Sequence, residues 1–191
     1  MDRPAQGQEP PRLESRSAPG YIADRQHRSS SPNVVDPMSA YSVRAATTDD
    51  TETIVEFNAQ LAKETENRVL ERSLLRRGVR ALLADPTKGT YYMAVDGATA
   101  VGQLMITHEW SDWRNGMFWW IQSVYVRPEH RGKGVFALLY AHILSEAKRH
   151  GGIAGLRLYV EHNNTRAQNT YTKLGMKKSE YEMFERDFVL D

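Results

Sequence analysis

Residues Met117 to His150 read MFWWIQSVYVRPEHRGKGVFALLYAHILSEAKRH, and this stretch decides the fold. Its first part is strongly apolar without polar alternation, which is typical of a strand buried on both faces, and Pro128 ends that strand. A short basic turn follows. Beyond the turn, apolar residues recur at the spacing of one helix face, at Val135, Leu138, Leu139, Ile143 and Ala147. The stretch therefore predicts a strand, a glycine-rich turn and a helix.

The turn Arg131-Gly132-Lys133-Gly134 is a candidate phosphate-binding loop. Such a turn directs several backbone N–H groups to one point, at the positive end of the helix dipole. The two basic side chains add positive charge. It is not a Walker loop, because no Lys-Ser/Thr pair follows the last glycine.

Two motifs resemble those of the GCN5-related N-acetyltransferase (GNAT) superfamily. The run VYVRPEHRGKGVFALLY resembles its acetyl-CoA-binding segment, Arg/Gln-x-x-Gly-x-Gly/Ala; Arg131 and Gly134 match, whereas Phe136 replaces the last small residue. That bulkier residue narrows the room beside the pyrophosphate. The second motif, Asn-x-x-Ala followed by Tyr-x-Lys-x-Gly-Phe, is matched by 164–167 and 171–176. The two motifs stand in the expected order and spacing, and the resemblance extends from about Tyr41 to the C-terminus.

This resemblance implies an α/β (α+β) fold, in which a mixed central sheet is flanked by helices on both faces. We expect the domain to span 41–191, with the element order β-α-α-β-β-β-α-β-α-β. Residues 1–40 hold six of the eight prolines and few large apolar residues, so they predict a disordered tail. Met38 is a hypothetical translation start just before the first strand.

Local patterns predict the remaining elements. The spacing of 49–52 is that of a capping box at the start of the first helix, and a second helix is expected from about Val69 to Asp85-Pro86. Asp96-Gly97 predicts a hairpin between strands 90–95 and 98–107. The next segments are expected as a connecting loop over 108–116, a strand over 155–161, a helix ending at Gly175 and a bent closing strand over 176–188.

Composition limits the classes of partner. The formal net charge is +1, there is no cysteine, and no apolar run approaches the about 18 residues that a membrane span requires. We therefore expect a cytoplasmic protein without a nucleic-acid or membrane partner, and we predict no metal. The arginines of the second helix are interpreted as a solvated face. A homodimer is an option that the sequence leaves open.

The resemblance implies which residues hold acetyl-CoA. Backbone groups of the central strand would pair with the pantetheine arm, the loop and first helical turn would hold the pyrophosphate, and one amide side chain would bind the arm. The residues are Val124, Tyr125, Val126, Arg131, Gly132, Lys133, Gly134, Val135, Phe136, Ala137 and Asn164. Asn164 is equally well suited to be only a helix N-cap.

Acetyl transfer to an amine needs an acid for the departing thiolate and a base for the amine. The family counterpart of Tyr171 lies near the sulfur, so Tyr171 is the candidate acid. Gln122 stands where polyamine-acetylating relatives carry a glutamate, and an amide cannot accept that proton. Glu109 or the pair Glu64 and Glu66 would then serve as base. A carboxylate among tryptophans would have its pKa raised by desolvation, which suits a base that works near neutral pH. Alternatively, the amine enters the site already neutral, and no base is needed.

Acids and aromatic rings gathered in one pocket favour a cationic acceptor, such as a small amine, a polyamine or a lysine side chain. The residues expected around it are Glu64, Trp110, Asp112, Trp113 and Gln122. Arg114 either binds a substrate carboxylate or pairs with Asp112. The alternative function is a non-catalytic acyl-CoA sensor, which Gln122 and Phe136 would suit.

Overall fold

The structure, a computed structural model, describes residues 41–189. The expected tail over 1–40 and the start at Met38 lie outside the described residues.

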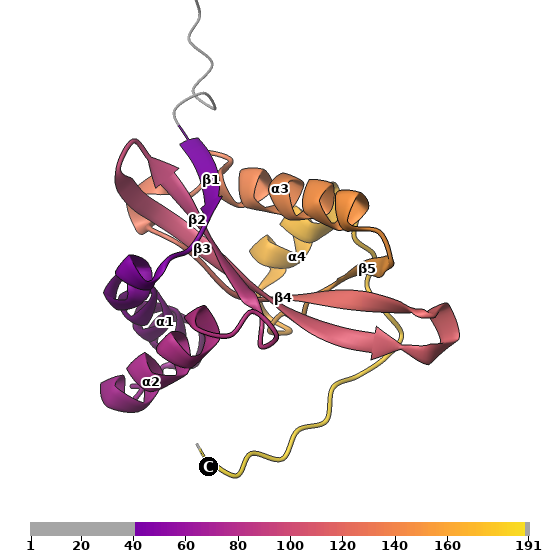
Figure 1. Cartoon of the computed structure of the whole chain (residues 1–191), viewed down its shortest axis with the longest axis horizontal. Helices are drawn as coiled ribbons and strands as arrows, with labels where there is room; N and C mark the ends of the chain where they lie inside the picture. The colour runs from indigo at the N-terminus through magenta and orange to yellow at the C-terminus, as the bar shows by residue number, and fades with distance from the viewer. Residues whose placement is uncertain (1–40, 190–191) are drawn as a thin grey trace, which may run out of the picture. The chain divides into compact units, whose positions relative to one another are not determined.

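One mixed sheet organises the domain (Figure 1). Its strands lie in the order β1-β2-β3-β4-β5; neighbours from β1 to β4 are antiparallel, whereas β5 runs parallel to β4. The strands are β1 (Tyr41–Ala45), β2 (Thr90–Asp96), β3 (Thr99–Ser111), β4 (Gly116–Val126) and β5 (Ile153–Arg157).

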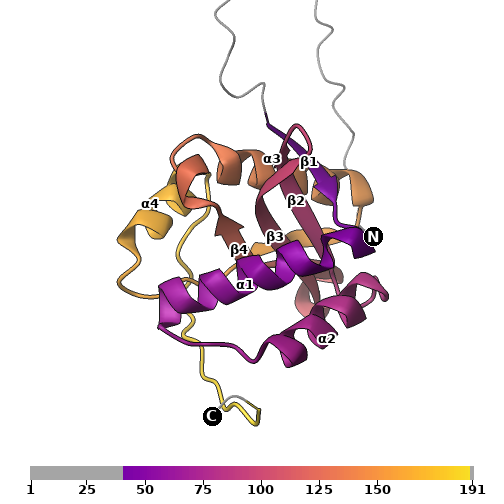
Figure 2. The same ribbon diagram turned by 90° about the vertical axis from the view of Figure 1, so that its left-hand side faces the viewer.

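Helices cover both faces of this sheet, as Figures 1 and 2 show. The first two helices lie on one face, and the third lies on the other. The helices are α1 (Thr51–Glu66), α2 (Arg72–Leu83), α3 (Val135–His150) and α4 (Thr165–Lys173). The expected fold class, a mixed sheet with helices on both faces, is confirmed.

Two apolar clusters hold these layers together, one on each face of the sheet. On the α3 face, Val135, Leu139 and Ile143 pack against the sheet residues Leu104 and Ile106. On the α1 and α2 face the cluster contains Ile54, Phe57, Val79, Tyr91, Met93 and Tyr125. Because burial is nearly complete in both clusters, the strands that carry the site have a rigid support.

The start of α1 differs from the sequence prediction. The capping box uses Thr47 and Asp50, two residues earlier than expected, and it precedes a short 3-10 turn. Asp50 is buried, and its carboxylate accepts hydrogen bonds of 2.7 and 2.8 Å from the Arg44 guanidinium and one of 2.8 Å from the Thr47 amide. The ion pair with Arg44 therefore ties β1 to the start of α1.

We expect Asp50→Asn to flatten the acid dependence of stability. The Arg44 hydrogen bonds, aided by those of Thr47, hold the pKa of the Asp50 carboxyl below its ordinary value. A carboxyl whose pKa is lower in the folded state than in the unfolded state stabilises the fold at pH values above its unfolded-state pKa. This stabilisation is lost as the pH falls through its folded-state pKa. Urea unfolding at pH 7 and at successively lower pH should show a smaller loss of unfolding free energy for the variant than for the wild type. Equal losses would contradict this role of Asp50.

The end of the β3–β4 hairpin also corrects the prediction. Residues 108–111, expected in a connecting loop, continue β3 and pair with β4 in the register His108↔Trp119 to Ser111↔Gly116. Only a 3-10 turn over Asp112–Arg114 joins the two strands. The β3–β4 hairpin is therefore longer than the sequence pattern predicted.

Three further boundaries differ from expectation. Helix α2 begins at Arg72, because the Glu71 carboxylate caps it by accepting hydrogen bonds from the amides of Ser73 and Leu74. Strand β5 covers 153–157 rather than 155–161. The expected closing strand over 176–188 is wrong, since 176–189 form no helix or strand.

Ion pairs to α1 occupy two arginines of α2. Arg72 pairs with Glu56 and Arg76 with Glu52, at 2.7 and 2.6 Å. This agrees with the interpretation of a solvated, charged face. Among residues 41–189, no helix is both long and apolar enough to span a bilayer.

Candidate active site

The site begins where β4 and β5 part. The two strands pair from Met117↔Ile153 to Trp120↔Arg157, and β5 ends at Arg157. Strand β4 continues to Val126, and beyond Trp120 no strand of the described chain pairs with that edge. The backbone of Val124–Val126 thus forms an unpaired strand edge, to which an extended ligand can bind as an added strand.

A bulge in β4 marks the same place. The register with β3 shifts between Gln103↔Tyr125 and Met105↔Gln122, and Ser123 has a φ of 49°. The fully buried Gln103 side chain donates from Nε2 to the Ser123 carbonyl at 3.2 Å and to Asn58 Oδ1 at 2.7 Å. This buried network from α1 and β3 supports the irregular backbone of β4.

The loop after β4 fits an anion. Gly132 and Gly134 have φ values of 76° and 82°, in the left-handed region that favours glycine. Gly134 is the N-cap of α3, and no side chain caps this helix end. The first backbone N–H groups of α3 are therefore left without a capping side chain, as a phosphate-binding helix start requires.

Arg131, which is expected beside the pyrophosphate, contacts α1 and β4. Its guanidinium donates to Glu64 on α1 at 2.6 Å and to the Val126 carbonyl at 2.8 Å, and it lies 5.5 Å from the Tyr125 ring centre. Arg131 thus fixes the loop against α1 and β4. Glu64, expected in the acceptor pocket, is the ion-pair partner of this loop residue.

Phe136 packs against aromatic rings of α3 and α4. Its ring centre is 5.5 Å from that of Tyr171 in an edge-to-face arrangement and 6.3 Å from that of Tyr140. The bulky side chain at the last position of the motif thus packs against the candidate acid.

Tyr171 lies on α4 and is half-buried. Burial raises the pKa of its hydroxyl above the ordinary value of a phenol, so the phenol holds its proton at neutral pH. No hydrogen bond joins this hydroxyl to any other side chain or backbone group within 41–189. The proton is therefore free to be donated to a bound molecule.

Asn164 is the N-cap of α4, and its Oδ1 accepts a hydrogen bond from the Ala167 amide at 3.0 Å. The capping interpretation is confirmed. The side-chain Nδ2 donates to none of the described residues, so binding of the pantetheine arm stays a prediction.

Glu109 is the centre of a polar cluster on β3, β4 and β5. Its carboxylate accepts hydrogen bonds from Trp120 Nε1 and, at 2.7 and 2.9 Å, from Arg157 Nη1. The guanidinium of Arg157 also lies 3.8 Å from the Phe118 ring centre. The bonds from Trp120 and then from Arg157 lower the pKa of the Glu109 carboxyl. The expectation that desolvation raises the pKa of this carboxyl is therefore wrong.

The remaining residues expected around the acceptor lie on β3, on β4 and in the turn between them. Gln122 donates to Thr107 Oγ1 at 2.6 Å beside the Glu109 cluster. Trp110 and Trp113 are 58% and 85% exposed at the hairpin end. Asp112 accepts a hydrogen bond from the Trp113 amide at 2.8 Å, and Arg114 lies over the Phe118 ring. The two tryptophans thus do not enclose a carboxylate.

Glu66 is the last residue of α1 and is exposed. No hydrogen bond or ion pair joins its carboxylate to the rest of the described chain. Burial raises the pKa of the Tyr159 hydroxyl, and the charges of Glu185 and Glu66 raise it further.

Sequence reasoning missed three residues of this region. Trp120 and Arg157 donate hydrogen bonds to Glu109, and the third residue, Tyr159, has its ring centre 6.3 Å from that of Trp120. The signal was available for Trp120, because positions two apart in a strand share a face and Gln122 was already a candidate. The positions of Arg157 and Tyr159 depend on the pairing of β5 with β4.

Comparisons with known proteins agree with this geometry. The family model described as the acetyltransferase (GNAT) family matches residues 54–176. The chain belongs to this family. It is accordingly an acyltransferase of the acetyl-CoA-dependent, N-acetylating kind. No curated protein matches the chain.

Solved structures of this GNAT protein's relatives are similar across most of the chain. The structure of a possible acetyltransferase from Clostridium difficile 630 is 45% identical, with a TM-score of 0.73, covering 78% of this chain and 99% of that one. A predicted acetyltransferase with acetyl-CoA from Clostridium acetobutylicum is 18% identical, with a TM-score of 0.64 and coverages of 76% and 96%. AAC(6')-Iy in complex with a bisubstrate analog, CoA-S-monomethyl-acetylneamine, is 16% identical, with a TM-score of 0.65 and coverages of 78% and 98%.

Proposed function

We propose that the protein transfers the acetyl group of acetyl-CoA to a primary amine by direct attack within a ternary complex. The observation that carries the proposal is the uncapped start of α3 behind two left-handed glycines, next to the unpaired edge of β4. Bound acetyl-CoA supplies an activated acyl group. The chain's own residues then orient the thioester and move two protons.

The backbone amides of Gly132–Ala137 would hold the diphosphate, since dipole and N–H groups both favour an anion there. Lys133 is exposed beside them and adds positive charge. The edge of β4 over Val124–Val126 would hold the pantetheine arm as an added strand. Asn164 would bind an amide of that arm through its free Nδ2.

Tyr171 is the proposed general acid. Its hydroxyl donates a proton to the sulfur as the carbon–sulfur bond breaks, and the new carbon–nitrogen bond forms at the same carbonyl carbon. The raised pKa keeps the Tyr171 phenol protonated at neutral pH, so it is in its acid form when the sulfur departs.

Glu66 is proposed as the base, acting through water. A carboxylate held by Trp120 and Arg157, as in Glu109, is a weaker proton acceptor, because its hydrogen bonds favour the charged form. Glu66 makes no such bonds to the described chain. Glu109 then becomes a positioning residue that orients Arg157 and Trp120.

We expect Glu66→Gln to lower kcat/KM by about tenfold. An exposed carboxylate that works through water contributes less than a buried base, so the effect is modest. Glu109→Gln, measured in parallel, should lower kcat/KM less than Glu66→Gln does. A larger loss in Glu109→Gln than in Glu66→Gln would mean that the assignment of the base is wrong.

The acceptor is proposed to be a cationic amine, either a small amine or polyamine or a lysine side chain. Glu66 and Glu185 bring negative charge to the neighbouring rings of Trp120 and Tyr159, and both charge and ring faces attract ammonium groups. The charge of Arg157 is offset by Glu109.

Steady-state kinetics with matched acceptors test this proposal. Spermidine, a mono-amine, a lysine peptide and the amino acid glutamate would be compared at equal acetyl-CoA. We expect kcat/KM to rise with the positive charge of the acceptor. Turnover confined to anionic or neutral acceptors would contradict the cationic assignment.

A further inference from the structure

Helix α4 carries the proposed acid, but hydrogen bonds do not fix it to α3 or to the sheet. Within residues 41–189, the side-chain hydrogen bonds of Gln168, Thr170 and Thr172 all end at backbone carbonyl groups of 161–168. No residue of α4 is fully buried. The position of α4 therefore depends on the packing of a few apolar and aromatic side chains.

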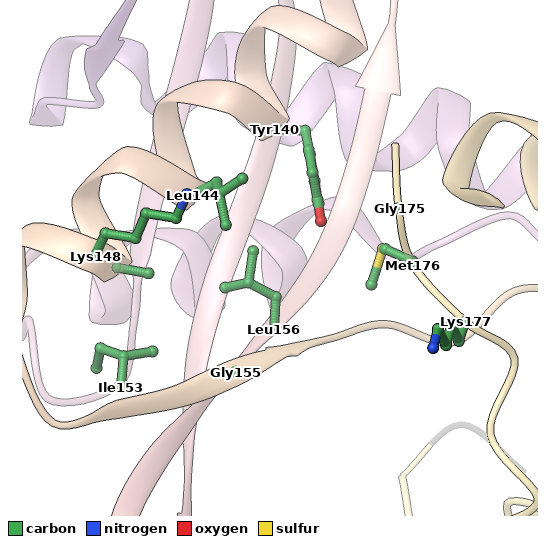
Figure 3. Close-up of a pocket in the computed structure, with 10 residues that line it drawn as sticks. Tyr140, Leu144, Lys148, Ile153, Gly155, Leu156, Gly175, Met176 and Lys177 are labelled. Atoms are coloured by element: carbon green, nitrogen blue, oxygen red, sulfur yellow. The ribbon is translucent and has the colours of Figure 1, made fainter. Parts of the chain in front are cut away.

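A groove of about 350 Å³ lies between α3 and the residues that follow α4. Figure 3 shows Tyr140 and Leu144 of α3 on its lining, together with Gly175 and Met176 from the chain beyond α4. Closely packed side chains hold their neighbours in one place, whereas an open groove does not. The contacts of α4 nearer the start of α3 therefore matter more for its position.

Phe136 supplies a ring contact between the two helices. Its ring centre lies 5.5 Å from that of Tyr171, with 67° between the ring planes, which is the edge-to-face geometry that aromatic pairs favour. Tyr140, one turn further along α3, contacts the same Phe136 ring at 6.3 Å. Because no hydrogen bond within 41–189 holds the Tyr171 hydroxyl, the direction of this hydroxyl follows from the packing of its ring.

The backbone of Phe136 lies at the proposed diphosphate site. Gly134 is the N-cap of α3 and Val135 is its first residue, so the Phe136 amide is one of the first N–H groups of the helix. The same residue thus offers its backbone to the anion and its side chain to the acid. One helical turn therefore relates the position of the diphosphate to that of the Tyr171 ring.

We propose that Phe136 is a positioning residue for acetyl transfer, whose ring directs the Tyr171 hydroxyl toward the sulfur of the acetyl-CoA that the loop holds. The inference rests on the proposed function, in which Tyr171 protonates the departing sulfur. The motif that 131–136 resembles has a small residue at the last position, and such a residue could not make this contact. Phe136 is therefore a feature of this chain rather than of the motif.

Phe136→Ala separates an effect on kcat from an effect on cofactor binding. We expect kcat to fall about tenfold, because a displaced acid meets the sulfur less often, and the dissociation constant of acetyl-CoA to stay within about threefold of wild type. Phe136→Leu, which keeps apolar volume without the ring, should give an intermediate kcat. An unchanged kcat in Phe136→Ala, or a loss confined to acetyl-CoA binding, would overturn the inference.

Leu144→Ala is the matched control for a loss of packing. Leu144 lies about two turns beyond Phe136 on α3, and both are half-buried side chains packed against the same apolar cluster. We expect both variants to lose thermal stability, but only Phe136→Ala to lose kcat. Equal losses of kcat in the two variants would mean that general packing explains the effect and that the inference is wrong.

A double-mutant cycle tests whether Phe136 acts through Tyr171. The value of kcat would be compared among the wild type, Phe136→Ala, Tyr171→Phe and the double variant, all at saturating acetyl-CoA. Once Tyr171→Phe has removed the acid, we expect Phe136→Ala to change kcat by less than about twofold. The same loss from Phe136→Ala in both backgrounds would overturn the inference and leave the acid assignment intact. A wild-type kcat in Tyr171→Phe alone would overturn the acid assignment, and the inference with it.

Discussion

We expect Tyr171→Phe to lower kcat by about 10²- to 10⁴-fold while leaving the dissociation constant of acetyl-CoA within about twofold of wild type. The change removes one oxygen atom from a half-buried ring that still packs against Phe136. The departing thiolate then loses its proton donor, whereas the loop and the strand edge that hold the cofactor stay intact. Stopped-flow turnover and calorimetry with acetyl-CoA measure the two quantities.

Tyr140→Phe is the matched control. Tyr140 also packs against the Phe136 ring, at 6.3 Å between ring centres, and burial likewise raises the pKa of its hydroxyl. We expect its kcat to stay near the wild-type value. Equal losses in both variants would mean that ring packing, rather than proton donation, explains the effect of Tyr171→Phe.

The second large effect is expected from Gly134→Asp, which should weaken acetyl-CoA binding on the order of 100-fold. Asp tolerates a positive φ better than most residues, so the backbone value of 82° at the N-cap can be kept. Its carboxylate would lie beside the diphosphate, and two like charges about 4 Å apart repel by a few kcal/mol near a surface. Each 1.4 kcal/mol changes the dissociation constant about tenfold.

Gly134→Asn separates charge from shape in the same experiment. Its side chain has nearly the same size and the same tolerance of positive φ, and both residues are good helix N-caps. We expect Gly134→Asn to weaken binding only a few-fold, with both variants at least as stable to urea as the wild type. Similar affinities for the two variants would place the diphosphate away from this helix start.

The sequence predicted those parts of the fold that depend on local chemistry. Helix α3 begins at Val135 after the glycine turn, as expected. Helix α4 ends just before Gly175, whose φ of 86° shows why a residue without a Cβ stands there. The hairpin at Asp96-Gly97 was likewise confirmed.

The parts that depend on long-range pairing were predicted less well. Glu109 was expected in a loop among exposed tryptophans, but its environment is set by Trp120 and Arg157, which reach it from two other strands. The pairing of Glu64 with Arg131 likewise joins residues 67 positions apart. No local pattern encodes such contacts, although the types of residue involved were visible.

The closing strand over 176–188 shows a second limit of sequence patterns. The segment alternates in sequence, but 176–189 form no helix or strand. Tyr181 and Phe184 are exposed, because alternation alone does not supply the neighbouring strand that a sheet needs.

The most direct test of the central claim is a titration of the ¹⁵N-labelled full-length protein with acetyl-CoA, followed by backbone amide chemical shifts. The account predicts saturable binding, with the largest shifts at the amides of Gly132–Ala137 and further shifts along Val124–Val126. Saturable binding that leaves the amides of Gly132–Ala137 unchanged, or no binding by well-folded protein, would contradict it.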